Sequence, residues 1–100
     1  MYTGGLSELK LVTKNDDIIN LVNNIKNQFE QLYNNKIYIL KAISYKTQIV
    51  NGINYYIKVL VNEYNYVHLK IYEALPNKKI LPKLINYQLN KNENDEIKYI

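Results

Sequence analysis

The sequence predicts an α+β fold in which one long helix packs against an antiparallel sheet of four to five strands. Two observations support this: a helical stripe of apolar residues lies between residues 13 and 36, and period-two runs fill most of residues 38–89. A helix and an antiparallel sheet that each bury one face form a stable two-layer arrangement. With 100 residues, no linker and no internal repeat, we expect a single domain over residues 1–100.

A brief strand over residues 8–12 and then the helix are expected first. Thr13 followed by Asp16 resembles a capping box, and the carboxylates of Asp16 and Asp17 suit the positive end of a helix macrodipole. Apolar residues then recur at steps of three and four: Ile18, Leu21, Val22, Ile25, Phe29, Leu32 and Tyr33. This stripe is assigned to the core, and the polar run Asn34-Asn35-Lys36 is expected to end the helix.

A long antiparallel hairpin is predicted for roughly residues 38–61. Asn51-Gly52 separates its two alternating runs, and Asn-Gly in that position is the strongest short hairpin signal. Gly52 tolerates the positive φ that such a turn needs, and Asn51 tolerates it better than most residues. Ile49 and Val50 place apolar side chains at the exposed tip, where they gain nothing for folding, so they suggest a binding contact.

Three further strands are expected, over residues 66–72, 83–89 and 95–100. In the first of them one set of alternating residues faces the helix (Val67, Leu69 and Ile71) and the other faces away (Tyr66, His68, Lys70 and Tyr72). Two prolines and a lysine pair make residues 73–82 an irregular connection. Leu75 is a second apolar residue on a turn, and Pro76 fixes φ beside it.

Composition and charge exclude several classes of partner. The chain has no cysteine, so it has no disulfide framework. Its net charge is +4, but all thirteen cations are scattered lysines, so we expect a solvated surface and no nucleic-acid or membrane partner. No apolar run approaches the roughly 18 residues that a membrane span needs. We find no signal peptide at the start, so a cytoplasmic location is expected.

No constellation of residues indicates catalysis. His68 is the only histidine and lies on a strand, without the partners that a triad or a metal site needs. No pair of carboxylates and no glycine-rich phosphate loop is recognisable. We therefore expect a protein that is not an enzyme and that uses neither a metal nor another cofactor.

The stretch Gln48-Ile49-Val50-Asn51-Gly52 also matches Gln-x-Val-x-Gly, the signature of the cystatins, which are reversible inhibitors of papain-like cysteine proteases. Its surroundings resemble the stefins, the short, cysteine-poor branch of that family. The matching segments run in the same order over nearly the whole chain: Gly4–Glu8, Tyr45–Val59, Tyr66–Ile71, Leu75-Pro76 and Tyr87-Gln88. The resemblance implies a cystatin-like fold.

In stefins three segments form a wedge that enters the cleft of a papain-like protease of the cathepsin type. The resemblance implies that an N-terminal trunk lies along the non-primed subsites, a hairpin tip lies over the catalytic Cys–His pair, and a second loop touches the primed side. The corresponding residues here are Tyr2, Thr3, Gly4 and Gly5 for the trunk, Gln48, Ile49, Val50, Asn51 and Gly52 for the tip, and Leu75 and Pro76 for the loop. Asn51 stands where a small Ala is usual.

Two other classes of function stay open. A cystatin-like chain could be a non-inhibitory interaction module, because fold does not fix function. Its long hairpin could also open and exchange between protomers, which would convert the expected monomer into a domain-swapped dimer and abolish inhibition. Nucleic-acid binding through tyrosines and lysines is a weaker alternative and would depend steeply on salt. The resemblance favours a reversible, competitive, tight-binding inhibitor.

Overall fold

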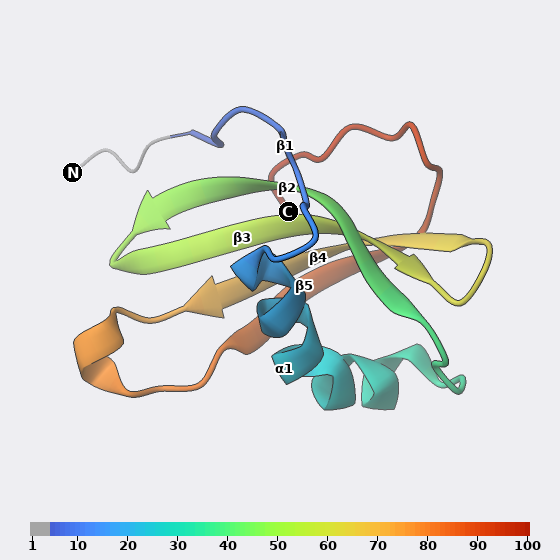
Figure 1. Cartoon of the computed structure of the whole chain (residues 1–100), viewed down its shortest axis with the longest axis horizontal. Helices are drawn as coiled ribbons and strands as arrows, with labels where there is room; N and C mark the ends of the chain where they lie inside the picture. Colours follow the sequence, from blue (N-terminus) through green and yellow to red (C-terminus); the bar gives the residue numbers. More distant parts are fainter. Residues whose placement is uncertain (1–4) are drawn as a thin grey trace.

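A computed structural model of the chain describes residues 5–100. One helix, α1 (Asp17–Tyr33), packs on a five-stranded sheet whose strands lie side by side in chain order (Figure 1). The strands are β1 (Lys10–Leu11), β2 (Leu40–Val50), β3 (Gly52–Val61), β4 (Asn65–Glu73) and β5 (Lys83–Lys91), and a 3-10 turn, η1 (Pro76–Lys78), precedes the last. Every neighbouring pair is antiparallel. The predicted α+β fold is confirmed.

Helix α1 begins at a different cap from the one expected. The carboxylate of Asp16 accepts a hydrogen bond from the backbone N–H of Ile18 at 3.1 Å, so Asp16 itself is the N-cap. Thr13 closes the preceding turn instead, because its carbonyl accepts from the N–H of Asp16. The helix ends as predicted: Asn34 adopts the left-handed conformation with φ of 61°.

The helix buries most of the predicted stripe against the sheet. Ile18, Leu21, Val22, Ile25 and Phe29 are each at most 5% exposed. Leu32 was expected in the core, but this prediction is wrong, because Leu32 is 51% exposed. In the last helical turn the ring of Tyr33 contacts the core instead, stacked on Phe29 with ring centroids 5.2 Å apart.

The sheet supplies the other half of the core. As predicted, Val67, Leu69 and Ile71 of β4 face the helix and are at most 1% exposed. A bulge interrupts the β2–β3 pairing between Ala42 and Ser44. The alternation of β2 changes face there, so that Ala42 and then Tyr45 contact the core.

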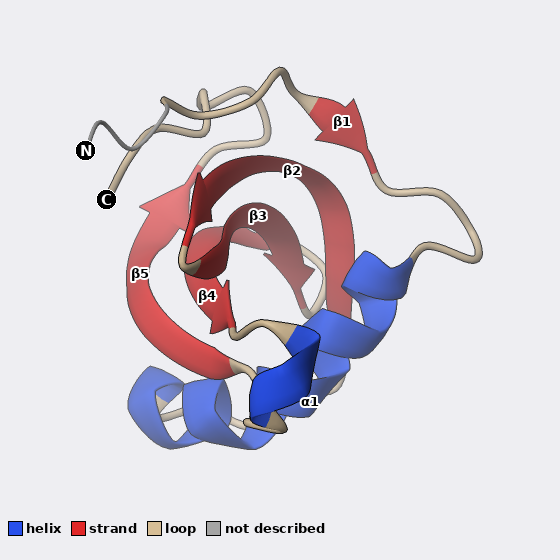
Figure 2. Ribbon diagram, turned by 90° about the vertical axis from the view of Figure 1, so that its left-hand side faces the viewer, coloured by secondary structure: helices blue, strands red, loops and turns tan. Residues whose placement is uncertain are grey.

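The strand expected over residues 95–100 is wrong. After β5 the chain has no further strand in the part that the structure describes, and it crosses the face of the sheet that α1 leaves free (Figure 2). Lysine side chains hold this segment: Lys58 Nζ donates to the carbonyl of Glu93 and Lys70 Nζ donates to that of Ile100 at 3.0 Å. Within this segment Ile97 is only 2% exposed, whereas Tyr99 is 65% exposed, so Ile97 packs against the sheet without strand pairing.

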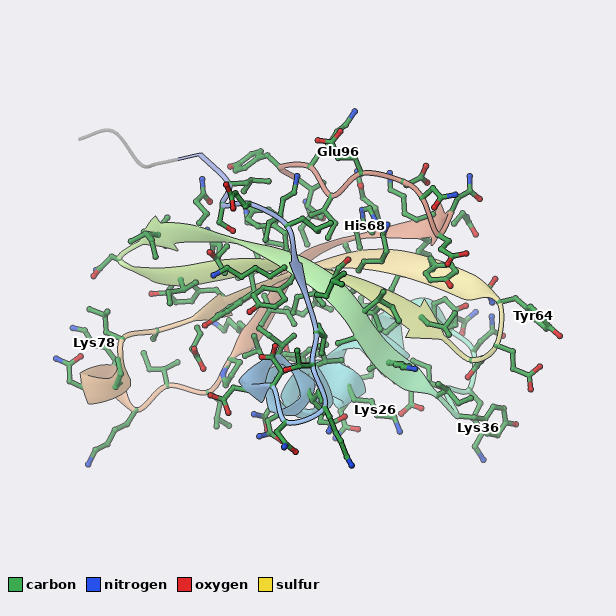
Figure 3. All side chains as sticks on the ribbon, turned by 45° about the horizontal axis from the view of Figure 1, so that its top comes forward. Lys26, Lys36, Tyr64, His68, Lys78 and Glu96 are labelled. Carbon is green, nitrogen blue, oxygen red and sulfur yellow. The ribbon has the colours of Figure 1, made fainter. Side chains whose placement is uncertain are left out.

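The segment over residues 92–100 also covers two residues expected to face outward. His68 and Lys70 do lie on the side away from the helix, but they are only 3% and 9% exposed. Lys70 Nζ lies over the ring of Tyr99, 4.5 Å from its centroid. His68 lies between the sheet and the covering segment (Figure 3), and its burial, with the charges of Lys58 and Lys91, lowers its pKa to about 4.

Candidate functional site

The N-terminal segment is tied to the end of β2 that leads into the hairpin tip. The backbone N–H of Ser7 donates to the carbonyl of Thr47 at 2.8 Å, and the N–H of Thr47 donates to Ser7 Oγ at 2.9 Å. Because this segment runs antiparallel to β2, the chain before Ser7 is directed toward the tip. Gly5 therefore approaches the same end of the molecule as Asn51.

The pairing of β3 with β4 brings a second loop to this end. Ile53 lies opposite Glu73, so the chain leaves β4 directly beside the β2–β3 turn. Leu75 and Pro76 follow within three residues, and Figure 1 shows η1 and the turn at the same end of the molecule. The turn and the loop border one groove, lined by Gly52, Ile53, Glu73, Ala74, Leu75, Pro76, Lys79 and Ile80.

The hairpin tip is as tight as the Asn-Gly pair predicted. Val50 pairs with Gly52, and Asn51 alone lies between them. Gly52 has a φ of 116°, whereas Asn51 is not among the residues with positive φ. Ile49 is 65% exposed, and Val50 is half-buried. The tip therefore displays aliphatic side chains at an exposed turn, which is typical of a contact surface.

A side chain from β4 holds this tip. The hydroxyl of Tyr72 donates a hydrogen bond to the carbonyl of Asn51. A Cβ placed on Gly52 would lie 2.6 Å from the carbonyl oxygen of Glu73 and 2.8 Å from the ring of Tyr72. Glycine is thus required at residue 52 both by its φ and by the close approach of β4. Tyr72 and Gly52 together fix where the tip lies.

Gln48, one of the predicted site residues, turns inward. It is only 9% exposed, and its Oε1 accepts from the hydroxyl of Tyr56 at 2.9 Å and from Nδ2 of Asn54 at 3.1 Å. These bonds join the two strands just below the tip. Gln48 therefore positions the tip from below, and Ile49, Val50 and Asn51 form the surface above it.

The remaining predicted residues lie at the same edge where they are described. Gly5 is exposed, and nothing lies within 4 Å of a Cβ placed on it. Leu75 is 42% exposed and Pro76 begins η1. Tyr2, Thr3 and Gly4 lie outside the described residues. We call the surface made by Gly5, Ile49–Gly52 and Leu75-Pro76 the tip edge.

Sequence reasoning missed three residues that support the tip edge: Tyr72, Tyr56 and Asn54. The place of Tyr72 could have been predicted by counting residues along the strands from the two turns. Two tight turns, at Asn51-Gly52 and at residues 62–64, fix the pairing so that Glu73 falls opposite Ile53 and Tyr72 falls next to the tip. The contact of Tyr56 with Gln48 follows from the same register, because both lie on the face away from the helix.

The tip edge offers contact surface and no reactive group. Its nearest titratable pair is Tyr55 and Glu73: the Tyr55 hydroxyl donates to Glu73 Oε1 at 3.3 Å, and burial together with that carboxylate raises the pKa of Tyr55 to about 12. Over residues 5–100, no group of three or more His, Asp or Glu side chains could hold a metal ion. In the same range no helix is long and apolar enough to span a membrane.

Comparison with known proteins identifies relatives along nearly the whole chain. The model of the cystatin domain family matches residues 4–94. Cystatin-A of Felis catus is 43% identical over 97% of this chain and 97% of its own length. Leukocyte cysteine proteinase inhibitor 1 of Sus scrofa is 40% identical over 97% of this chain and 92% of its own. Cystatin-B of Bos taurus is 37% identical over 99% of both. None of these three is named as an enzyme, and the stefin resemblance is confirmed.

Proposed function

The chain belongs to the cystatin family, and from that premise we propose that it is a reversible, competitive, tight-binding inhibitor of papain-like cysteine proteases. The observation that carries this proposal is the meeting of the N-terminal segment, the hairpin tip and the Leu75-Pro76 loop at one end of the molecule. The pig relative is named for inhibiting cysteine proteinases, which agrees with it.

The tip edge would act as a wedge in the protease cleft. The hairpin tip lies over the catalytic Cys–His pair, the trunk runs along the non-primed subsites, and Leu75-Pro76 touches the primed side. Because no peptide bond is presented in attack geometry, the enzyme is blocked without being acylated. A tip held by Tyr72 and Gln48 loses little entropy on binding, which favours tight association.

The proposal is tested by titrating papain with the monomeric protein in the presence of a fluorogenic peptide substrate. We expect competitive and reversible loss of activity at stoichiometric or nanomolar concentrations. The monomer is isolated by gel filtration, because a domain-swapped dimer would straighten the tip. A folded, monodisperse monomer that leaves papain fully active would contradict the proposal and favour a non-inhibitory interaction module.

A substitution at the tip checks the wedge. Val50→Asp places a carboxylate where the cleft would remove water, so we expect the inhibition constant to rise by about 100-fold or more. Tyr64→Asp is the matched control, because Tyr64 is 84% exposed at the opposite end of the molecule (Figure 3) and its replacement should not change inhibition. Circular dichroism confirms that both variants are folded. Equal inhibition by the two variants would exclude the tip as a contact.

A further inference from the structure

The connection between β4 and β5 carries positive charge without any acidic residue. From Ala74 to Asn92 the sequence contains Lys78, Lys79, Lys83 and Lys91, and neither Asp nor Glu. Two of these lysines, Lys78 and Lys79, lie beside Leu75-Pro76 and thus next to the tip edge.

The local backbone directs this pair outward. Pro76 starts the 3-10 turn, Lys78 ends it, and Lys79 follows in the left-handed conformation with φ of 52°. Residues 75–81 are all exposed, and Figure 3 shows Lys78 at the extremity of the molecule, on η1. Within residues 5–100 the ion pair found is that of Lys46 with Glu96, so neither ammonium group of the loop is neutralised by a salt bridge to a described residue.

Lys79 also borders the groove between the two loops. Gly52 and Ile53 line one side of this groove, and Leu75, Pro76 and Ile80 line the other. The one carboxylate in its lining belongs to Glu73, which accepts a hydrogen bond from Tyr55. A partner that fits against the tip edge would therefore meet aliphatic side chains in the groove and two lysines along its outer margin.

We propose that Lys78 and Lys79 make this inhibitor selective for papain-like proteases that carry acidic side chains on the cleft wall of the primed side. This inference rests on the proposed function and goes beyond it by naming a feature of the target. Complementary charge at the margin of an interface mainly accelerates association, by roughly 10-fold or more at low salt. The effect reaches about one Debye length, roughly 10 Å at 0.1 M salt, so the acidic groups need not contact the lysines.

The experiment compares two forms of one protease. One is papain, and the other is papain with two carboxylates introduced on the cleft wall of the primed side. Association and dissociation rates are measured by progress curves at about 25 mM and about 250 mM NaCl. We expect the wild-type inhibitor to associate about three- to tenfold faster with the acidified enzyme at the lower salt concentration, and to lose most of that preference at the higher one. Dissociation should change little.

Two double variants of the inhibitor locate the effect. Lys78→Glu/Lys79→Glu should abolish or reverse the preference for the acidified enzyme. Lys26→Glu/Lys36→Glu is the matched control: it changes the net charge equally, but Lys26 and Lys36 lie away from η1 in Figure 3, so the preference should persist. A preference that survives in the first variant, or that is lost equally in both, would overturn the proposal.

The outcomes separate this inference from the function on which it rests. Inhibition of both enzyme forms without any preference would overturn the selectivity alone. No inhibition of either form would overturn the proposed function, and the inference with it.

Discussion

At the scale of single residues, the hairpin tip depends on a hydroxyl from a strand that does not belong to the hairpin. Tyr72 of β4 donates to the carbonyl of Asn51, and its ring lies against Gly52. Tyr72→Phe keeps the ring and removes the hydrogen bond, which is worth about 0.5–1.5 kcal/mol. We expect the inhibitor to dissociate from papain about three- to tenfold faster, because the tip is held less firmly before and during binding.

The control for this substitution is Tyr66→Phe, which removes a hydroxyl near the other end of the same strand. Tyr66→Phe should unfold at nearly the same urea concentration as the wild type, whereas Tyr72→Phe should unfold at a slightly lower one because of the lost hydrogen bond. If the two tyrosine variants dissociate at the same rate, Tyr72 does not position the tip.

The residue-level site was predictable only in part. The Asn51-Gly52 turn and its apolar flanks follow from local propensity, and the structure confirms the positive φ of Gly52. The core-facing residues of β2 were not predictable from alternation, because the bulge near Ala42 changes the face of the strand, so that Ala42 and then Tyr45 contact the core. A single unpaired residue shifts that alternation, and no composition signal marks it.

At the scale of elements, the N-terminal segment divides into an anchored part and a part free to make contacts. Ser7 holds the chain to β2 through two hydrogen bonds, whereas Gly5 is exposed and nothing lies within 4 Å of a Cβ placed on it. Removal of residues 1–5 should therefore leave the urea midpoint unchanged and speed dissociation from papain, with little change in the association rate. An unaltered dissociation rate would show that the trunk makes no contact with this protease.

Sequence periodicity predicted the helix and the hairpin strands correctly, but it did not predict the structure of residues 95–100. The helix stripe and the strands of the hairpin follow from spacing alone, because each buries one face of its own. Residues 95–100 also alternate, yet the segment that contains them is held by Lys58 of β3 and Lys70 of β4, which bind the carbonyls of Glu93 and Ile100, and not by a neighbouring strand. Periodicity detects burial of alternate side chains but does not reveal what covers them, and for that reason His68 was expected to face solvent.

At the scale of the whole molecule, the covered outer face should make stability depend on pH. His68 is enclosed there by Lys58 of β3, Lys91 of β5 and Asp95 of the covering segment, and its pKa in the folded state is about 4. In the unfolded chain a histidine titrates near pH 6.5. Between these two values the unfolded state binds a proton that the folded state does not, so the free energy of unfolding falls as the pH drops.

Urea unfolding at about pH 7 and about pH 4.5 measures this loss, which is at most about 3 kcal/mol for His68. The free energy of unfolding of His68→Gln should fall less between the two pH values, because the substitution removes the group that titrates. Carboxylates contribute to the pH dependence of both the wild type and His68→Gln. The quantity to compare is therefore the difference between the two proteins in the free energy of unfolding that each loses. Equal losses would mean that His68 does not control the acid response.

The end of the molecule opposite the tip edge carries the β3–β4 turn, with Tyr64 84% exposed (Figure 3). Since the chain contains no cysteine, Tyr64→Cys would give it a single thiol. A maleimide-coated sensor chip would then hold every copy by the same point, with the tip edges turned toward solution. The fold therefore allows all copies of the protein to be attached to a biosensor in one orientation. Capture of a protease from a dilute sample could then be followed without a label.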